Sequence, residues 1–345
     1  MAKVSDIYRL FLETNIISKL LCINFLLMRV LVNNSLPNLF VIGAPKAGTS
    51  ALVSAIGQHP EIYVPYKKEP RFFDAPIYYD YEEDYPIRSI DEYLSIYNSL
   101  YSQNASYRVD GSVFNMYSLA SIKNILKLSP NAKFVVMLRD PESASKSMHA
   151  QRLKYHINGM REISEKFCTC WRSLESRKAG KLYPEKCRNK FLFRYDLLYS
   201  YELYIPKILS IISTENIYID WYERFKNIPE IVCKDIFSFL NVKNDFIPKI
   251  KIKNPSYFIK PRMYNKIVSY MVWKSYRLRK SFGLRGTRVV KFKKLLFEKK
   301  IKVNNYENSE CDNEVRAFFE ATYKYLKTLG LYEKSHLSKT DSSNI

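Results

Sequence analysis

The chain has 345 residues, of which 47% are hydrophobic and 26% are charged. This balance is ordinary for a packed globular protein and argues against disorder over most of the length. Lys and Arg number 55 against 34 Asp and Glu, which gives a formal net charge of +21. Such an excess favours anionic partners, namely nucleotide phosphates, nucleic acid, acidic glycans or anionic lipid surfaces, but charge alone names none of them.

The N-terminal segment, residues 1–36, contains an apolar stretch over residues 16–32 that Lys19, Asn24 and Arg29 interrupt. The uncharged run between Lys19 and Arg29 is about half of the roughly 20 residues that a membrane-spanning helix requires. No small-residue cleavage site of the signal-peptide kind is recognisable. We therefore expect an amphipathic helix that packs on the domain, with peripheral membrane contact as the alternative. The expected location is cytoplasmic, with membrane association as the alternative.

Residues 38–43 form a short apolar run that ends in Gly and predicts a buried strand, and residues 50–58 predict a helix with Thr49 or Ser50 near its N-cap. The loop between them, residues 43–50, reads GAPKAGTS. A strand that enters a helix through a Gly-containing loop directs backbone N–H groups and the positive helix end toward one point. This segment predicts an anion-binding loop, and an ordinary strand–helix turn is the alternative.

Several residue types in this loop suit an anion. Gly48 lets the backbone approach closely, Lys46 supplies a positive point charge, and Thr49 and Ser50 supply hydroxyl donors. The spacing of Gly43 and Gly48 equals that of a Walker A loop, but Lys46 precedes Gly48 instead of following it. This departure argues against a nucleotide triphosphatase.

Residues 67–74 read KKEPRFFD and place an acid, Glu69, among basic side chains. Neighbouring cations favour the ionised form of a carboxyl group. A carboxylate near a bound hydroxyl can act as a general base. Glu69 is therefore a candidate base, and a solvated surface turn is the alternative for the segment.

A second buried strand is predicted over residues 133–138, followed by Arg139 and by a helix over residues 143–153. In that helix Ser147 lies about one turn from the start and could share a ligand with Arg139. Arginine together with a hydroxyl suits a phosphate monoester. Taken alone, an Arg-Asp-Pro strand end is equally typical of a cap and turn.

The other expected elements are a strand over 216–220 and helices over 118–128, 201–212, 231–240 and 313–331. Strands that alternate with helices favour a parallel sheet. We predict an α/β fold in which a P-loop-like central parallel sheet is flanked by helices, with helical additions at the cleft. Residues 254–302 form a basic, aromatic helical subregion whose charges could be solvated, line the cleft or contact a membrane. The tail, residues 334–345, is expected to be disordered.

The six cysteines show no CxxC pair and no zinc pattern with histidine. They are Cys22, Cys168, Cys170, Cys187, Cys233 and Cys311. A scattered set in a large chain predicts free thiols in a reducing compartment instead of a disulfide framework. We also expect no metal site.

Three segments occur in an order that resembles a known family. They are residues 44–50 (APKAGTS), residues 68–74 (KEPRFFD) and residues 138–141 (LRDP) followed by Ser147. In this order the chain resembles the sulfotransferases that use 3′-phosphoadenosine 5′-phosphosulfate. The glycan-modifying branch, with the heparan sulfate enzymes and their bacterial relatives, is the most similar in pattern. The resemblance implies a sulfotransferase domain over residues 37–333 that sulfates an acceptor hydroxyl, on a carbohydrate or glycolipid, without a metal.

The resemblance also implies roles for individual residues. The residues that would bind the donor's 5′-phosphosulfate are Lys46, Ala47, Gly48, Thr49 and Ser50, those for its 3′-phosphate are Arg139 and Ser147, and Tyr201 would touch the nucleotide. Lys46 would also neutralise charge on the bridging oxygen, and Glu69 would be the catalytic base. The residues beside the acceptor would be Lys68, Arg71 and Asp74. Relatives often carry a lysine near Asp110-Gly111-Ser112 that this sequence lacks, which leaves the acceptor contacts there open.

Two other classes of function stay open. A P-loop phosphotransferase that uses ATP and magnesium would share the loop, and Asp220 could then hold the metal. A basic nucleic-acid or membrane-surface protein without catalytic activity would explain the net charge. No nucleic-acid motif is present, so we expect no nucleic-acid partner. Neither the acceptor nor the oligomeric state follows from the sequence.

Overall fold

The computed structural model describes residues 36–74, 87–155, 159–187, 189–249 and 311–331. Within them, five strands form a parallel sheet in the order β2-β3-β1-β4-β5. The strands are β1 (Leu39–Gly43), β2 (Ile62–Tyr63), β3 (Tyr107–Asp110), β4 (Lys133–Leu138) and β5 (Ile217–Trp221). The order reverses at the central strand β1. In sheets of this kind ligands bind outside the carboxyl ends of the strands, near the strand where the order reverses.

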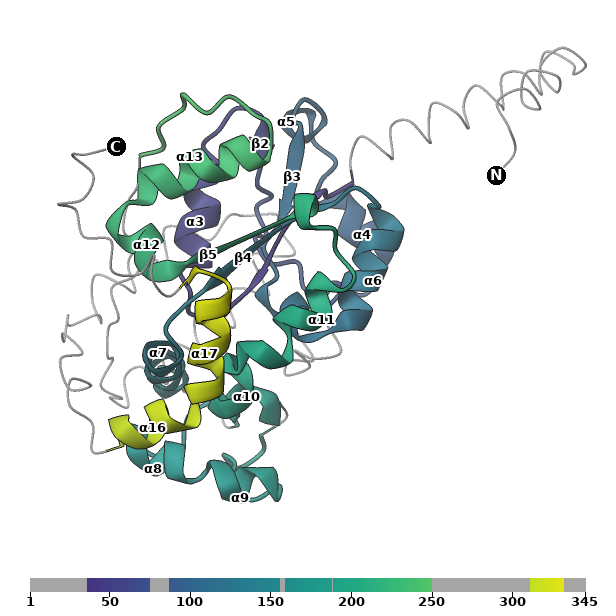
Figure 1. The fold of residues 1–345 in the computed structure, drawn as a ribbon. Coiled ribbons are helices and arrows are strands. Elements are labelled where there is room, and N and C mark those ends of the chain that lie inside the picture. The colour runs from purple at the N-terminus through teal and green to yellow at the C-terminus, as the bar shows by residue number, and fades with distance from the viewer. Residues whose placement is uncertain (1–35, 75–86, 156–158, 188, 250–310, 332–345) are drawn as a thin grey trace, which may run out of the picture.

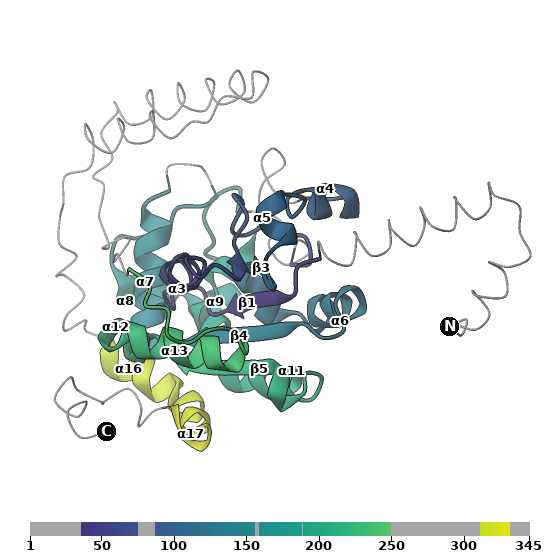
Figure 2. The same ribbon diagram turned by 90° about the horizontal axis from the view of Figure 1, so that it is seen from above.

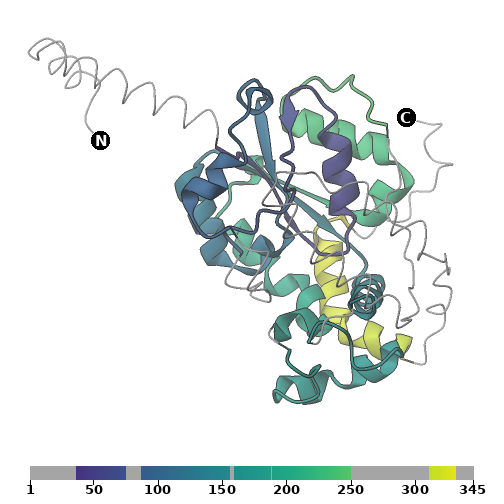
Figure 3. The same ribbon diagram turned by 180° about the vertical axis from the view of Figure 1, so that it is seen from behind.

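Helices cover both faces of the sheet (Figure 1). On one face α3 (Thr49–Ile56) packs with α13 (Pro229–Phe239), next to α12 (Tyr222–Asn227). On the other face α6 (Leu119–Leu128) packs with α11 (Ile205–Leu209), near α4 (Ile90–Ser95). The same division is visible from above and from behind (Figures 2 and 3). Because helices cover both faces, every residue of β1 is buried, and this explains its continuous apolar sequence.

A second group of helices lies beyond the carboxyl ends of β1 and β4, in the lower half of Figure 1. These helices are α7 (Pro141–Leu153), α8 (Phe167–Arg172), α9 (Leu174–Lys178), α10 (Tyr195–Tyr199), α16 (Asp312–Phe318) and α17 (Glu320–Thr328). α7 follows β4 directly and contacts α8, α10 and α16. The remaining short elements are α5 (Leu100–Gln103), η1 (Val113–Tyr117), η2 (Lys190–Phe193), η3 (Tyr201–Leu203) and η4 (Thr214–Asn216).

The predicted parallel sheet flanked by helices is confirmed. It includes the predicted strands β1, which precedes the anion-binding loop, and β4, which precedes Arg139. Two helix predictions were wrong in detail. The helix expected over 201–212 is divided into η3 and α11, because Pro206 lacks an N–H group and is tolerated only in the first turn of a new helix. The helix expected over 313–331 is divided at Phe319, which packs on Trp171 with ring centroids 5.7 Å apart.

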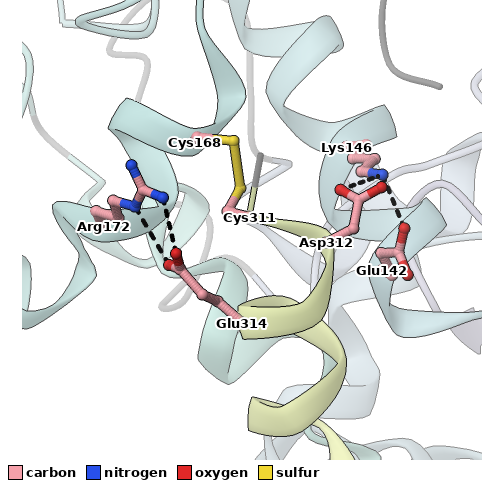
Figure 4. The surroundings of a disulfide bond; sticks show 7 residues. All are labelled: Glu142, Lys146, Cys168, Arg172, Cys311, Asp312 and Glu314. Carbon is pink, nitrogen blue, oxygen red and sulfur yellow. Dashed lines mark hydrogen bonds and ion pairs between the residues drawn. A yellow bond between two sulfur atoms is a disulfide. The ribbon is translucent and has the colours of Figure 1, made fainter. Parts of the chain in front are cut away.

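The expectation of free thiols was wrong for two cysteines. Cys168 on α8 and Cys311, directly before α16, form a disulfide (Figure 4). The sequence pattern did not indicate this pair, because the two residues lie 143 positions apart and come together only when α16 packs beside α8. Disulfides are typical of oxidising environments. The bond therefore does not favour the cytoplasmic location that the cysteine spacing suggested.

Ion pairs surround this disulfide (Figure 4). Arg172 on α8 donates two hydrogen bonds to Glu314 on α16, at 2.7 and 3.2 Å. Lys146 on α7 lies 2.9 Å from Asp312 and 2.7 Å from Glu142. The start of α16 is thus held to both α7 and α8.

Several predictions concern residues outside the described ranges. They are the amphipathic segment up to residue 35, the whole of the basic subregion 254–302 and the tail 334–345. Among the described helices, none combines the length and the apolar character that crossing a bilayer requires.

Candidate active site

The loop after β1 has a backbone that few sequences tolerate. Lys46 has φ 69° and Gly48 has φ 73°, both in the left-handed region. This region is unusual for a residue with a side chain and often marks a functional site. The Ala47 N–H donates to the Ala44 carbonyl at 3.2 Å, which closes a tight turn. Gly48 is the N-cap of α3, in place of the predicted Thr49 or Ser50, and no side chain of the described residues caps the helix. The first N–H groups of α3 therefore point toward the loop without a side-chain acceptor.

Gly48 is required by close packing as well as by its backbone angle. A Cβ atom at this position would lie 2.6 Å from Cδ2 of Tyr222, the first residue of α12. The ring of Tyr222 also lies under the guanidinium of Arg139, with 4.6 Å between Cζ and the ring centroid. The carboxyl ends of β1, β4 and β5 thus meet at one place.

Arg139 is fixed from several directions. Its Nη1 donates to the Lys46 carbonyl at 3.0 Å. Its own carbonyl accepts a hydrogen bond from the Tyr201 hydroxyl at 3.0 Å. Glu223 lies 3.8 Å from Nε. Burial raises the pKa of Glu223 to about 7, although the charge of Arg139 acts in the opposite direction. Arg139 and the anion-binding loop therefore form one rigid unit.

The ammonium group of Lys46 lies in strongly positive surroundings. Burial, together with the charges of Lys154, Arg139 and Arg152, lowers its pKa from 10.5 to about 8. Like charges disfavour the charged form of a lysine, and a bound anion would relieve this repulsion. The arrangement of these four cations suits an anion that carries more than one negative charge.

The segment that carries Glu69 lies beside the loop. Lys68 donates to the Ser50 hydroxyl at 3.1 Å, and its Nζ lies 2.6 Å from Oε1 of Glu69. Arg71 donates to the other oxygen of Glu69 at 3.0 Å. Burial raises the pKa of Glu69, but Lys68 and Arg71 outweigh burial and bring the pKa below 4.5. The structure thus brings Ser50, Lys68, Glu69 and Arg71 together.

Asp74 differs from Glu69 in its surroundings. Its side chain is fully buried, and neither carboxyl oxygen has a hydrogen-bond partner among the described residues. Burial raises its pKa from 3.8 to about 7; the charge of Arg71 lowers it, whereas Asp110 and Glu69 raise it further. Asp110 itself accepts hydrogen bonds from the Tyr93 hydroxyl at 2.7 Å and from the Ser112 N–H at 2.9 Å. An uncompensated buried carboxyl of this kind is costly and is typical of functional sites.

Two predicted site residues have other surroundings in the structure. Tyr201 is fully buried and holds the backbone of Arg139. Ser147 is half-buried on α7, and the described contacts do not join it to Arg139. Their contacts with a nucleotide stay predictions. Sequence reasoning missed Tyr222 and Arg152, although the position of Tyr222 at a strand's carboxyl end was a usable signal.

The buried histidines and Asp220 are bound by other groups of the protein, and their contacts do not indicate a histidine base or a magnesium ligand. His59 and His149 are buried, and each ring Nε2 lies within 3.0 Å of a backbone carbonyl. Asp220 is bound by Arg224 on α12 and by the Tyr218 hydroxyl, 2.5 Å away. Within the described ranges no three His, Cys, Asp or Glu side chains gather as a metal site would require.

Comparison with known proteins finds a match to one family model. The model of the sulfotransferase family matches residues 37–189, which include the anion-binding loop, Glu69 and Arg139. No match was found among curated proteins.

Three solved structures are similar to the chain. A sulfotransferase from Alicyclobacillus acidocaldarius is 24% identical, covers 74% of this chain and 98% of its own, and has a TM-score of 0.53. A sulfotransferase domain from the curacin biosynthetic pathway is 16% identical, with 60% and 75% covered and a TM-score of 0.40. A mouse sulfotransferase complexed with PAP is 15% identical, with 60% and 59% covered and a TM-score of 0.37. The first of these has the fold of this chain.

Proposed function

We propose that the chain, whose residues 37–189 match the model of the sulfotransferase family, transfers a sulfuryl group from 3′-phosphoadenosine 5′-phosphosulfate to an acceptor hydroxyl on a carbohydrate or glycolipid. One observation supports the donor most directly. The ammonium of Lys46 lies among three other cations, at a loop where backbone N–H groups of α3 converge.

The residues of the loop fit the donor's phosphosulfate. Gly48 allows close approach of the backbone, and the N-terminus of α3 has no side-chain cap among the described residues. When bound, the donor supplies the sulfuryl group, whose bond to the phosphate oxygen breaks as a bond to the acceptor oxygen forms. Lys46 would neutralise the charge left on that phosphate oxygen. With a pKa of about 8 it is protonated at pH 7.

A second anionic group of the donor, its 3′-phosphate, would bind at Arg139 with Ser147. Arg139 is held rigidly by the Lys46 carbonyl and by Tyr222, so its guanidinium is positioned before a ligand binds. Such preorganisation limits the entropy lost on binding. Glu223 lies 3.8 Å from Nε of Arg139, and a phosphate bound there would favour the protonated form of its carboxyl group through repulsion between like charges.

Glu69 would accept the proton of the acceptor hydroxyl. Its pKa below 4.5 means that it is ionised and available as a base at neutral pH. Lys68 contacts both Glu69 and Ser50 of the donor loop, which supports a base close to the transferred group. Lys68, Arg71 and Asp74 would border the acceptor.

An ATP-dependent phosphotransferase is less compatible with the site. Asp220, the residue that could hold magnesium, already binds Arg224 and lies among side chains of β5 and α12. A purely binding protein has no specific observation in its favour, because residues 254–302 lie outside the described ranges.

Calorimetry with 3′-phosphoadenosine 5′-phosphate and with ATP plus magnesium tests the proposal. We expect the 3′-phosphorylated nucleotide to bind at least tenfold more tightly, and Lys46→Ala and Arg139→Ala to weaken its binding. A preference for ATP would contradict the proposed donor. A panel of acceptors with labelled donor then identifies the class of acceptor.

A further inference from the structure

Asp140, the residue directly after Arg139, has both carboxylate oxygens bound by other parts of the fold. Oδ1 accepts a hydrogen bond from the N–H of Ser143 at 2.8 Å and so caps the start of α7. Oδ2 accepts one from the hydroxyl of Tyr323 at 2.7 Å. Tyr323 lies on α17, 183 positions further along the chain. The C-terminal helix therefore fixes the orientation of a carboxylate beside the candidate phosphate-binding arginine.

A second residue of α17 holds the helix at the same place. Thr322 is fully buried, and its hydroxyl donates to Glu202 of η3 at 2.6 Å. The neighbour of Glu202 in η3 is Tyr201, whose hydroxyl donates to the Arg139 carbonyl at 3.0 Å and accepts from the Arg139 N–H at 3.4 Å. Thr322 and Tyr323 are adjacent, and neighbouring residues of an α-helix point about 100° apart. α17 thus contacts both η3 and the start of α7, the two elements that meet at Arg139.

The Asp140 carboxylate would compete with a bound phosphate if it were not held in this way. Among the described ion pairs, Arg139 pairs with Glu223 at 3.8 Å and not with Asp140. The Nε of Arg139 has no hydrogen-bond partner within the described ranges, so the guanidinium keeps donor capacity for an acidic group. Chain neighbours do form ion pairs in this protein, as the 2.6 Å contact of Lys68 with Glu69 shows. A released Asp140 side chain would pair with Arg139 in the same manner, and a phosphate would then have to displace it.

We propose that Tyr323 is a positioning residue for the donor's 3′-phosphate, because it holds the Asp140 carboxylate so that the guanidinium of Arg139 stays available to the phosphate. This inference rests on the proposed function, which assigns that phosphate to Arg139. Tyr323 acts only through Asp140 and transfers no proton. Burial and the charge of Asp140 raise the pKa of Tyr323, so its hydroxyl remains a donor at neutral pH. A phenylalanine at this position keeps the ring but releases one oxygen of Asp140.

The test compares two nucleotides that differ only in the 3′-phosphate. Calorimetry measures the affinity of 3′-phosphoadenosine 5′-phosphate and of adenosine 5′-monophosphate for the full-length wild type and for each variant. We expect Tyr323→Phe to weaken binding of the first nucleotide about tenfold and to change binding of the second by less than about twofold. The matched control is Tyr325→Phe, which removes from the same helix a hydroxyl without a hydrogen bond in the described part of the chain. The control should keep the ratio of the two affinities, which a general loss of stability would not change.

A double variant tests the route through Asp140. When Tyr323→Phe is combined with Asp140→Asn, the released side chain carries no charge, so the affinity ratio should return to within about threefold of the wild-type value. An unchanged ratio in Tyr323→Phe, equal weakening of both nucleotides, or a ratio that stays low in the double variant overturns the proposal. Should Tyr323→Phe fail to fold, Asp140→Asn is measured alone. A ratio that is kept or raised in this variant supports the proposal, and a lower ratio overturns it.

The wild type separates the inference from the proposed function. A wild type that does not prefer the 3′-phosphorylated nucleotide shows that the proposed donor is wrong, and the inference falls with it. A preference that the wild type shows and Tyr323→Phe retains leaves the proposed function intact and refutes only the role of Tyr323.

Discussion

Replacing Asp74 by Asn should stabilise the protein at pH 8 but hardly change its stability near pH 4. The Asp74 side chain is fully buried, and within the described part of the chain neither oxygen has a hydrogen-bond partner. Its pKa is raised to about 7, first by burial and then by Asp110 and Glu69, against the effect of Arg71. An Asn side chain has nearly the same shape but carries no charge at any of these pH values.

The size and sign of the effect follow from linkage. The folded protein binds the Asp74 proton more tightly than the unfolded chain, whose carboxyl has the ordinary pKa of 3.8. The contribution of Asp74 to the free energy of unfolding is therefore highest below pH 3.8, decreases as the pH rises toward 7, and is constant above that. The difference between 3.8 and about 7 corresponds to roughly 4 kcal/mol. Asp74→Asn removes this loss, so the variant should gain about 4 kcal/mol over the wild type at pH 8.

Urea unfolding followed by circular dichroism, at steps between pH 4 and pH 8, measures the effect. The matched control is Asp245→Asn, which removes a carboxylate from an exposed position and should leave the pH dependence of the wild type intact. If wild type and Asp74→Asn show parallel curves, Asp74 does not ionise in a buried site and the reasoning is refuted. A gain in stability with a loss of turnover would indicate a buried charge kept for function.

Three further predictions concern the loop, the base and the disulfide. Gly48→Ala should lower the free energy of unfolding by about 1–2 kcal/mol and weaken donor binding. The reason is that φ at this position is 73° and the new Cβ would lie 2.6 Å from the Tyr222 ring. An unchanged melting temperature and an unchanged donor affinity would contradict the close packing of Gly48 on Tyr222. Glu69→Gln should reduce turnover about 100-fold with donor affinity kept. Since the pKa of Glu69 is below 4.5, the wild-type rate should not fall through its protonation between pH 8 and pH 5, whereas an acid limb near pH 7 would transfer the role of base to Asp74. Cys168→Ser should lower the free energy of unfolding by up to about 5 kcal/mol and abolish the effect of dithiothreitol; a wild type that is insensitive to dithiothreitol would show that the bond does not form.

The sequence predicted those elements whose pattern lies within a single strand or loop. β1 and β4 are apolar throughout because helices cover both faces of the sheet, and the pattern predicted both. The strand β3 was missed because its sequence, YRVD, contains two charged residues. Arg108 is nevertheless buried and donates to the carbonyls of Ser102 and Ala105, and Asp110 binds Tyr93. Local hydropathy does not reveal charges whose hydrogen bonds form only in the folded chain.

Features that depend on packing between elements were beyond the sequence pattern. Lys46, Glu69 and Arg139 were predicted because each follows a recognisable segment. The effect of the Arg152 charge on the pKa of Lys46 depends on how the end of α7 is placed relative to the loop. The packing of Tyr222 on Gly48 likewise depends on how β5 and α12 approach α3. Such residues lie far apart in the chain, and no spacing rule joins them.

The bond between Cys168 and Cys311 encloses β5, α12 and α13 in a covalent ring of the main chain. A protease that cuts once anywhere between these cysteines leaves two fragments that stay attached. The fragments separate on an electrophoresis gel only after reduction. After such a cut α17 also stays in place, where the Tyr323 hydroxyl donates to Asp140, the neighbour of Arg139, at 2.7 Å. Limited proteolysis could therefore nick the chain inside the ring while Arg139 keeps its support from the C-terminal helix.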